Sequence, residues 1–153
     1  MSLAFIYNRR KEGAIMERFL EAQSAGMYKL ALKEIKNGKK CSHWMWYIFP
    51  QMKGLGISSQ SKRYAIQDFE EARVFMKNGK LRRRLLKITK VVYKLNVDNV
   101  EEVFGYVDAM KLRSCMTLFD LATPKYKIFS KVLDKHFNGE MCEYTLNAFT
   151  ELL

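Results

Sequence analysis

The residues best suited to chemistry lie in the first half of the chain. The segment His43–Phe49 is almost entirely aromatic or apolar and holds both tryptophans of the chain, Trp44 and Trp46. Indole and phenol rings stack on flat ligands, and a histidine beside them donates a hydrogen bond. The alternative is plain core, which we prefer for Met45, Ile48 and Phe49. For His43 and the two tryptophans both interpretations stay open.

A glycine loop follows four residues later, Gly54-Leu55-Gly56-Ile57-Ser58. Glycines let the backbone approach an anion closely, and the N–H groups at Gly54, Gly56 and Ser58 would then bind phosphate. The loop lacks the Gly-x-Gly-x-x-Gly and Walker patterns, so a structural turn is the commoner outcome. Its closeness in sequence to the aromatic block nevertheless predicts a shared pocket.

A second polar cluster is expected on a helix from Asp108 to Ala122. Asp108, Lys111, Ser114 and Thr117 recur at three-residue steps, which gathers them near one helix face. Together with Arg113 they are candidate ligand contacts. The structural alternatives are an N-terminal cap for Asp108 and solvent exposure for Lys111 and Arg113. His43 and Asp108 are the best available proton-handling pair.

The charge of the chain is concentrated. Its 27 Lys and Arg exceed its 16 Asp and Glu and give a net charge of +11, and the segment 73–94 contains no acid. Four basic residues are predicted to point outward because they follow the apolar stripe of one helix by two positions; they are Arg83, Lys87, Lys90 and Lys94. This ridge would bind nucleic-acid phosphates. We prefer a solvated face, because no base-reading motif accompanies it.

The elements that must position these groups are helical. The length of 153 residues fits one domain, and we expect an extension over residues 1–15 followed by a single compact, mainly α domain over 16–153. Helices are predicted over 16–23, from Tyr28 to a stop at Gly38, and over 61–67, 81–95, 126–137 and 145–152. Asp68 should cap another helix that ends at Gly79. Residues 41–49 fit strand or helix, and helix is slightly preferred.

Composition also limits the surroundings of the protein. Three cysteines without a Cys-x-x-Cys pair favour reduced thiols and a cytoplasmic location. Two histidines and no ligand spacing argue against a metal site. We expect no cofactor, no signal peptide and no membrane span.

Several segments together resemble a bacterial family of unknown function that is often mislabelled "calpastatin". The most specific are Ser42–Gln51, Gly54–Ser58 and Lys111–Phe119, supported by 19–23, Tyr64-Ala65-Ile66 and 71–72. The resemblance extends from Met16 to the C-terminus, with Cys115 in place of a more usual serine. It implies a small, mainly helical intracellular protein and no activity. The calpastatin label does not suit a globular chain, because that inhibitor is disordered and repetitive.

The order of segments is also distantly similar to the NADAR family, helical proteins of NAD and ADP-ribose chemistry that cleave N-glycosidic bonds. That family carries Glu-His-Tyr where this chain has Lys62-Arg63-Tyr64. The likeness implies a NADAR-like helical arrangement, with Tyr64 near the ligand. The missing carboxylate would have to come from Glu71 or Asp108.

The sequence therefore predicts a pocket for a phosphorylated nucleotide-like ligand, with ADP-ribose as the leading candidate. The protein is either a binder of this ligand or an N-glycosidase-like hydrolase. The alternative is a basic, nucleic-acid-associated module without catalysis. A cavity shared by His43, the glycine loop and Lys111 would favour the pocket.

Overall fold

The most regular apolar pattern of the sequence forms the helix α6, Gly79–Tyr93. Leu81, Leu85, Ile88 and Val92 follow one another at steps of four, three and four, and all four are buried. This confirms the predicted inward face. The structure is a computed structural model and describes residues 2–153.

The centre of the fold is α8, Tyr106–Ala122, which packs against α5 (Phe69–Lys77), α9 (Ile128–Phe137) and α10 (Glu143–Thr150). Leu112, Cys115, Phe119 and Ala122 recur at helical spacing along one face of α8, and all four are buried. The Phe119 ring lies 5.3 Å from Phe75 on α5 and 5.7 Å from Phe129 on α9. Aromatic contacts of this kind tie the three helices into one core.

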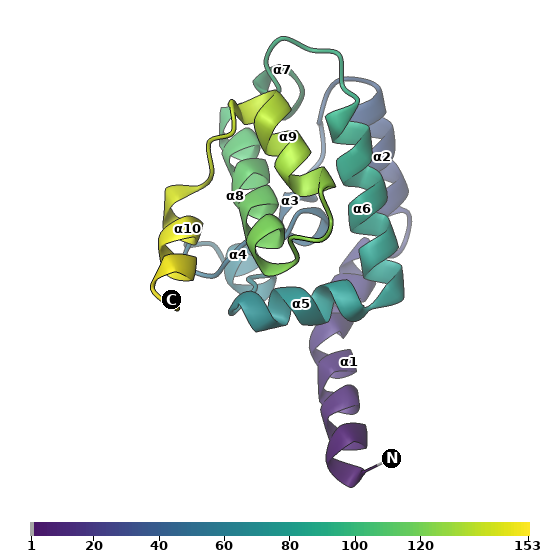
Figure 1. The fold of residues 1–153 in the computed structure, drawn as a ribbon. Helices are drawn as coiled ribbons and strands as arrows, with labels where there is room; N and C mark the ends of the chain where they lie inside the picture. Colours follow the sequence, from purple (N-terminus) through teal and green to yellow (C-terminus); the bar gives the residue numbers. More distant parts are fainter. Residues whose placement is uncertain (1) are drawn as a thin grey trace.

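The remaining helices surround this centre (Figure 1). They are α1 (Leu3–Gln23), α2 (Met27–Lys36), α3 (Met45–Ile48), α4 (Ser59–Arg63) and α7 (Glu101–Phe104). Residues 2–153 thus form ten helices and no strand, so the predicted mainly α, single-domain fold is confirmed. The N-terminal part of α1 projects from the body, and the predicted boundary after residue 15 lies inside this helix.

Three local predictions are wrong. Asp108 does not cap α8, because Gly105, at φ 77°, already separates α7 from α8 and α8 begins at Tyr106. Gly79 does not end α5; it opens α6, and the Asn78 side chain accepts a hydrogen bond from the Leu81 N–H. The helix predicted to reach Gln67 ends at Arg63, because Ile66 pairs with Met52 in an isolated parallel bridge.

Other local predictions are confirmed. The Asp68 carboxylate accepts a hydrogen bond from the Glu71 N–H at 2.8 Å and starts α5. Gly38, at φ 80°, follows the end of α2. The segment 41–49, for which the sequence allowed either a strand or a helix, contains the single helical turn α3. Across residues 2–153, no helix combines the length and the apolar character needed to cross a bilayer.

Candidate functional site

The aromatic block is attached to the body by a buried carboxylate on α2. Glu34, which is 7% exposed, accepts hydrogen bonds from the backbone N–H groups of Cys41 and Ser42, the Ser42 hydroxyl and the Trp44 indole N–H. Burial works to raise the pKa of this carboxyl, but the four donors outweigh it and lower the pKa to about 2. The turn that precedes α3 is therefore fixed by one ionised side chain.

The two tryptophans of the block have different surroundings. Trp44 is 0% exposed and packs against Phe49 and Phe104. It therefore lies in the core, where it forms no wall of a cavity. Trp46 is partly buried and lines a cavity beside the glycine loop. Of the two rings proposed from the sequence, the structure places one at a pocket.

The glycine loop is held at its base by main-chain hydrogen bonds between distant segments. The Lys53 N–H donates to the Ile66 carbonyl and the Ile66 N–H donates to the Gln51 carbonyl, both at 2.9 Å. The Tyr144 hydroxyl of α10 donates to the Lys53 carbonyl at 2.9 Å. Gly54 has φ 94°, a conformation that favours glycine. The loop is thus a defined turn.

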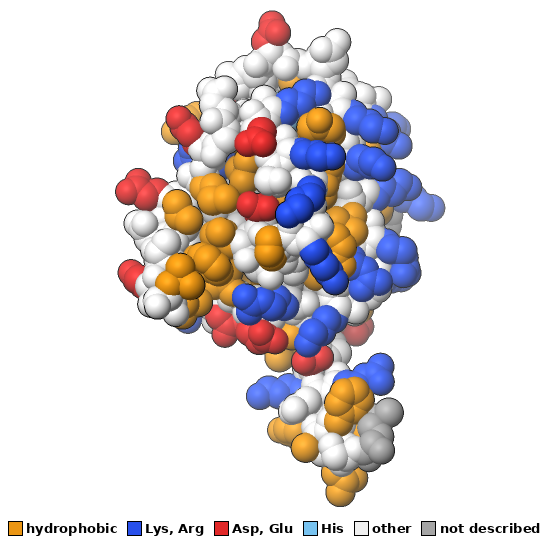
Figure 2. Space-filling view, viewed as in Figure 1, with side chains coloured by type: hydrophobic (Ala, Val, Ile, Leu, Met, Phe, Trp, Pro, Cys, Tyr) orange, Lys and Arg blue, Asp and Glu red, His pale blue; other side chains and the backbone are white. Residues whose placement is uncertain are grey.

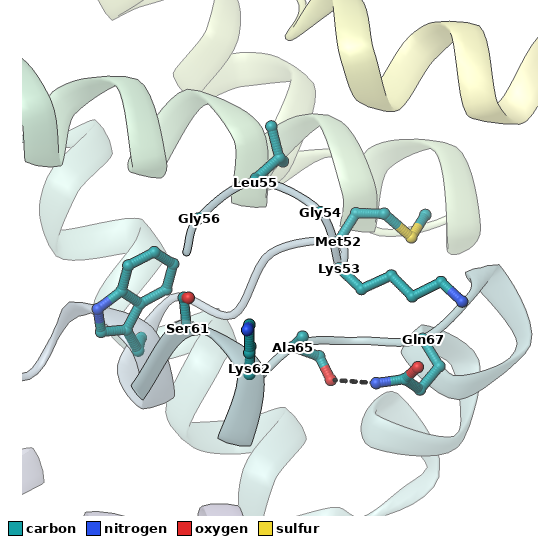
Figure 3. Close-up of a pocket in the computed structure, with 10 residues that line it drawn as sticks. Met52, Lys53, Gly54, Leu55, Gly56, Ser61, Lys62, Ala65 and Gln67 are labelled. Carbon is teal, nitrogen blue, oxygen red and sulfur yellow. Dashed lines mark hydrogen bonds between the residues drawn. The ribbon is translucent and has the colours of Figure 1, made fainter. Parts of the chain in front are cut away.

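The cavity under this loop has a volume of about 220 Å³. Figure 3 shows Gly54, Leu55 and Gly56 arching along one side of it, with Ser61, Lys62 and Ala65 on the other. A side chain at Gly56 would not fit, because its Cβ would lie 2.9 Å from the Trp46 ring and 2.8 Å from the Ser61 Cβ. The absence of a side chain at Gly56 thus allows the loop to close against the tryptophan.

Lys111 reaches this region through the same tryptophan. Its Nζ lies 4.3 Å from the centre of the Trp46 ring and 3.2 Å from Asp108 Oδ1. The other carboxylate oxygen of Asp108 lies 2.9 Å from Lys40 Nζ, which in turn sits 4.8 Å over the Trp44 ring. Burial works to raise the pKa of Asp108, but hydrogen bonds and charge from the two lysines lower it. Asp108 is therefore an ionised bridge and does not act as an N-terminal cap.

The rest of the predicted polar face of α8 serves the packing of α10. Ser114 and Thr117 are buried, and their hydroxyls donate to carbonyls one helical turn back in α8. The Thr117 hydroxyl also accepts a hydrogen bond from the Cys142 N–H at 2.9 Å. Arg113 points toward Glu140, with 3.8 Å between the charged groups. None of these three side chains lines the cavity by the loop.

The predicted catalytic side chains are not brought together. His43 is exposed and does not line the cavity. Glu71 forms an ion pair with Arg18, whose guanidinium also donates to the carbonyls of Arg63 and Ala65. Asp108 is engaged by two lysines, as described above. The sequence predicted one cavity bordered by His43, the loop and Lys111. The observed cavity is lined by Trp46 and the glycines of the loop, and neither His43 nor Lys111 lines it.

Two further candidates have structural partners. Tyr64 is buried, with its ring 5.3 Å from Tyr47 and 6.0 Å from Phe19. The Ser58 hydroxyl accepts a hydrogen bond from the Ser61 N–H at the start of α4. Within residues 2–153, no three His, Cys, Asp or Glu side chains gather in a way that could hold a metal ion.

The cavity also has lining residues outside the predicted site. Lys53 and Lys62 lie on either side of the loop in the sequence, and this placement indicates that they are close to the cavity. Met52, Ala65 and Gln67 reach the cavity only because the segment before the loop pairs with the segment after α4. Such a pairing between distant segments has no local signature.

The basic ridge faces solvent as predicted, since Arg83, Lys87, Lys90 and Lys94 are all exposed. The neighbouring helix α2, which packs against α6, adds further exposed lysines; they are Lys29, Lys33 and Lys36. The one acid in these two helices, Glu34, is buried. Figure 2 shows basic side chains gathered over α6 and the helix beside it.

Fold and site together define a small, single-domain, all-α protein with a tryptophan-lined cavity under a glycine loop. The family described as "Protein of unknown function (DUF1810)" matches residues 14–149, and the chain belongs to this family.

One solved structure is similar to most of the chain. It is the crystal structure of the conserved hypothetical protein Rv1873 from Mycobacterium tuberculosis, with a TM-score of 0.83 and 37% sequence identity. The match covers 86% of this chain and 94% of that chain. No curated protein matches the chain. These comparisons do not show the likeness to NADAR proteins or the calpastatin label.

Proposed function

We propose that the protein binds a phosphorylated, nucleotide-like small molecule in the cavity under the glycine loop. The observation that supports this best is the composition of the cavity. An aromatic wall, Trp46, stands beside a glycine loop, with two lysines, Lys53 and Lys62, among the lining residues. Indole rings stack on flat groups, lysines attract phosphate, and a side-chain-free backbone allows close approach.

The size of the cavity restricts the bound part of the ligand. At about 220 Å³, the cavity is smaller than the 300–1,000 Å³ or so of pockets that enclose a whole drug-sized molecule. We therefore propose that it receives one ring or one sugar phosphate, while the rest of the ligand lies along the surface. ADP-ribose remains the leading candidate among complete ligands.

Binding without hydrolysis is the form of the proposal that the geometry favours. Cleavage of an N-glycosidic bond needs a carboxylate close to the leaving bond. The described lining residues of the cavity include no acid and no histidine, and Glu71 and Asp108 are both held in ion pairs. The cysteine content still favours a cytoplasmic location for this binding.

Titrations with ribose 5-phosphate, AMP, NAD and ADP-ribose test the proposal. Binding beside Trp46 should change the tryptophan fluorescence, and a ligand at 100 times its Kd should stabilise the fold by about 2.7 kcal/mol. The Lys53→Gln/Lys62→Gln variant should bind at least about tenfold more weakly, because each lysine offers charge-assisted contacts to phosphate.

The matched control is Lys131→Gln, which removes one exposed lysine on α9, remote from the cavity lining. Its affinity should equal that of the parent chain. Equal affinity of the parent and the double variant for every ligand, or no binding by any of the four, would contradict the proposal.

A second candidate function is the binding of nucleic acid by α2 and α6. The observation in its favour is that seven exposed basic residues lie on two packed helices whose single acid is buried. Replacing Arg83, Lys87, Lys90 and Lys94 by Gln should weaken binding to a DNA or RNA duplex. The slope of log K against log salt should become shallower by up to about 3.6. An unchanged slope would remove this surface from consideration.

A further inference from the structure

We propose a second, separate binding site, in the cleft between α5, the start of α6 and the turn after α8. Its ligand is a small organic anion with a flat apolar body and a phosphate or carboxylate head. The cleft has a volume of about 480 Å³, within the usual range for small-molecule sites. It shares no lining residue with the cavity under the glycine loop, so this proposal does not depend on the proposed function.

The apolar part of the cleft comes from two segments that are distant in sequence, α5 and the turn after α8. Met76 of α5 and Ala122 at the end of α8 are buried, and Pro124 and the half-buried Tyr126 complete the lining. Aliphatic atoms and a tyrosine ring on neighbouring walls fit a flat ring system. Figure 2 shows hydrophobic and basic side chains next to one another in the region between α5, α6 and α9.

The charged part of the cleft is held in place by the backbone. Arg73 Nε donates to the Ala122 carbonyl at 3.1 Å, and Arg82 Nη1 donates to the Met76 carbonyl at 3.0 Å. Each guanidinium is thus fixed at the rim, and its remaining N–H groups face no other acceptor among the described residues except at Arg73 Nη1, which also donates to Glu70. A planar guanidinium matches the geometry of phosphate and carboxylate with two parallel hydrogen bonds.

The balance of charge around the cleft favours an anion. Lys77 and Lys125 also line it, and no acid is among the described lining residues. The nearest anionic partner of either arginine is Glu70, at 3.2 Å from Arg73 Nη1. The Glu70 side chain is 65% exposed, and an exposed pair of this kind is weak and easily replaced by a ligand.

The test uses 2-naphthyl phosphate, 2-naphthoate and the neutral 2-naphthol as probes, with calorimetry on the full chain. We expect the two anions to bind and the neutral compound to bind at least about tenfold more weakly. The relative affinities of phosphate and carboxylate decide which head group the site prefers. Backbone amide signals of Ala122 and Tyr126 should shift, whereas those of Gly54 and Gly56 at the other cavity should not change.

Variants then show which basic side chains bind the anionic head group. Arg73→Gln and Arg82→Gln should each weaken anion binding about tenfold, and Arg73→Lys should recover only part of the loss because it lacks the planar fork. Lys125→Gln avoids the backbone hydrogen bonds and should weaken binding without a change in thermal midpoint; Lys131→Gln is the control that should bind like the parent. Equal affinity for 2-naphthol, full affinity in the arginine variants, or no binding at millimolar concentration overturns the proposal.

Discussion

Trp44 and Trp46 are two residues apart, yet a carboxylate acts on each of them in a different way. Glu34 binds the Trp44 side of the block directly through four neutral donors and is almost fully buried. Asp108 acts on Trp46 only through the ammonium group of Lys111, and its side chain is 20% exposed. The first arrangement anchors the fold, and the second positions a ring beside a cavity. Hydrogen bonds in the core should therefore cost more to break than ion pairs at the rim.

The largest effect is expected for Glu34→Gln. The amide nitrogen of glutamine would face N–H and O–H donors and could not accept their hydrogen bonds, so buried N–H groups would lose their acceptor. The free energy of unfolding should therefore fall by about 2–4 kcal/mol. Urea unfolding measures this change. Glu17→Gln, an exposed glutamate on α1, is the control and should have almost no effect.

The same variant makes a prediction for pH. The pKa of Glu34 is about 2 in the folded chain against 4.5 ordinarily, so its contribution is present above pH 4.5 and is lost as pH falls toward 2. The loss should amount to about 3 kcal/mol in the parent chain and be absent in Glu34→Gln. Equal acid sensitivity of both proteins would show that Glu34 is not the anchor.

A smaller effect is expected at the cavity for Gly54→Ala. Alanine is strained at φ 94°, and its Cβ would lie 2.1 Å from the Tyr144 hydroxyl, which must move and give up its hydrogen bond to Lys53. The free energy of unfolding should fall by about 1–3 kcal/mol. Gly13→Ala in α1, where nothing lies within 4 Å of the new Cβ, should instead stabilise by about 0.5–1 kcal/mol. Two changes of the same sign would contradict this account.

Asp108→Asn should have a still smaller effect on stability, about 1 kcal/mol. The Asp108 and Lys111 side chains are 20% and 23% exposed, so water screens this pair, and the amide oxygen of asparagine can still accept a hydrogen bond from the 7% exposed Lys40. The loss should shrink at high salt. Asp98→Asn, on an exposed loop, should show neither change. A loss as large as that of Glu34→Gln would erase the distinction between the two carboxylates.

The smallest effect on stability is expected for the exposed basic ridge. Replacing Arg83, Lys87, Lys90 and Lys94 by Gln should change the free energy of unfolding by less than about 0.5 kcal/mol, because all four face solvent. Thermal unfolding gives this value directly. A larger loss would mean that these side chains also pack against the body.

How much of this could be predicted from the sequence depends on the range of the interactions. The inward face of α6 and the cap at Asp68 were predictable, because the period of a helix and the start of a helix are local properties. The role of Asp108 was not predictable, because its ion-pair partner Lys40 comes from a segment that is distant in sequence. Asp108 pairs with this lysine and does not cap the start of α8. The same holds for the candidate site: the loop was visible in the sequence, but the split between Trp44 and Trp46 depends on Glu34.

Helix α1 has a consequence for the motion of the whole molecule. At 1.5 Å per residue, its 21 residues span about 31 Å, and its first turns stand clear of the body (Figure 1). The protein should therefore tumble anisotropically in solution, more slowly about axes across this rod than about the axis along it. The amide N–H bonds of α1 lie nearly parallel to that axis, so their nuclear relaxation should report a longer correlation time than the bonds of α5, which crosses it.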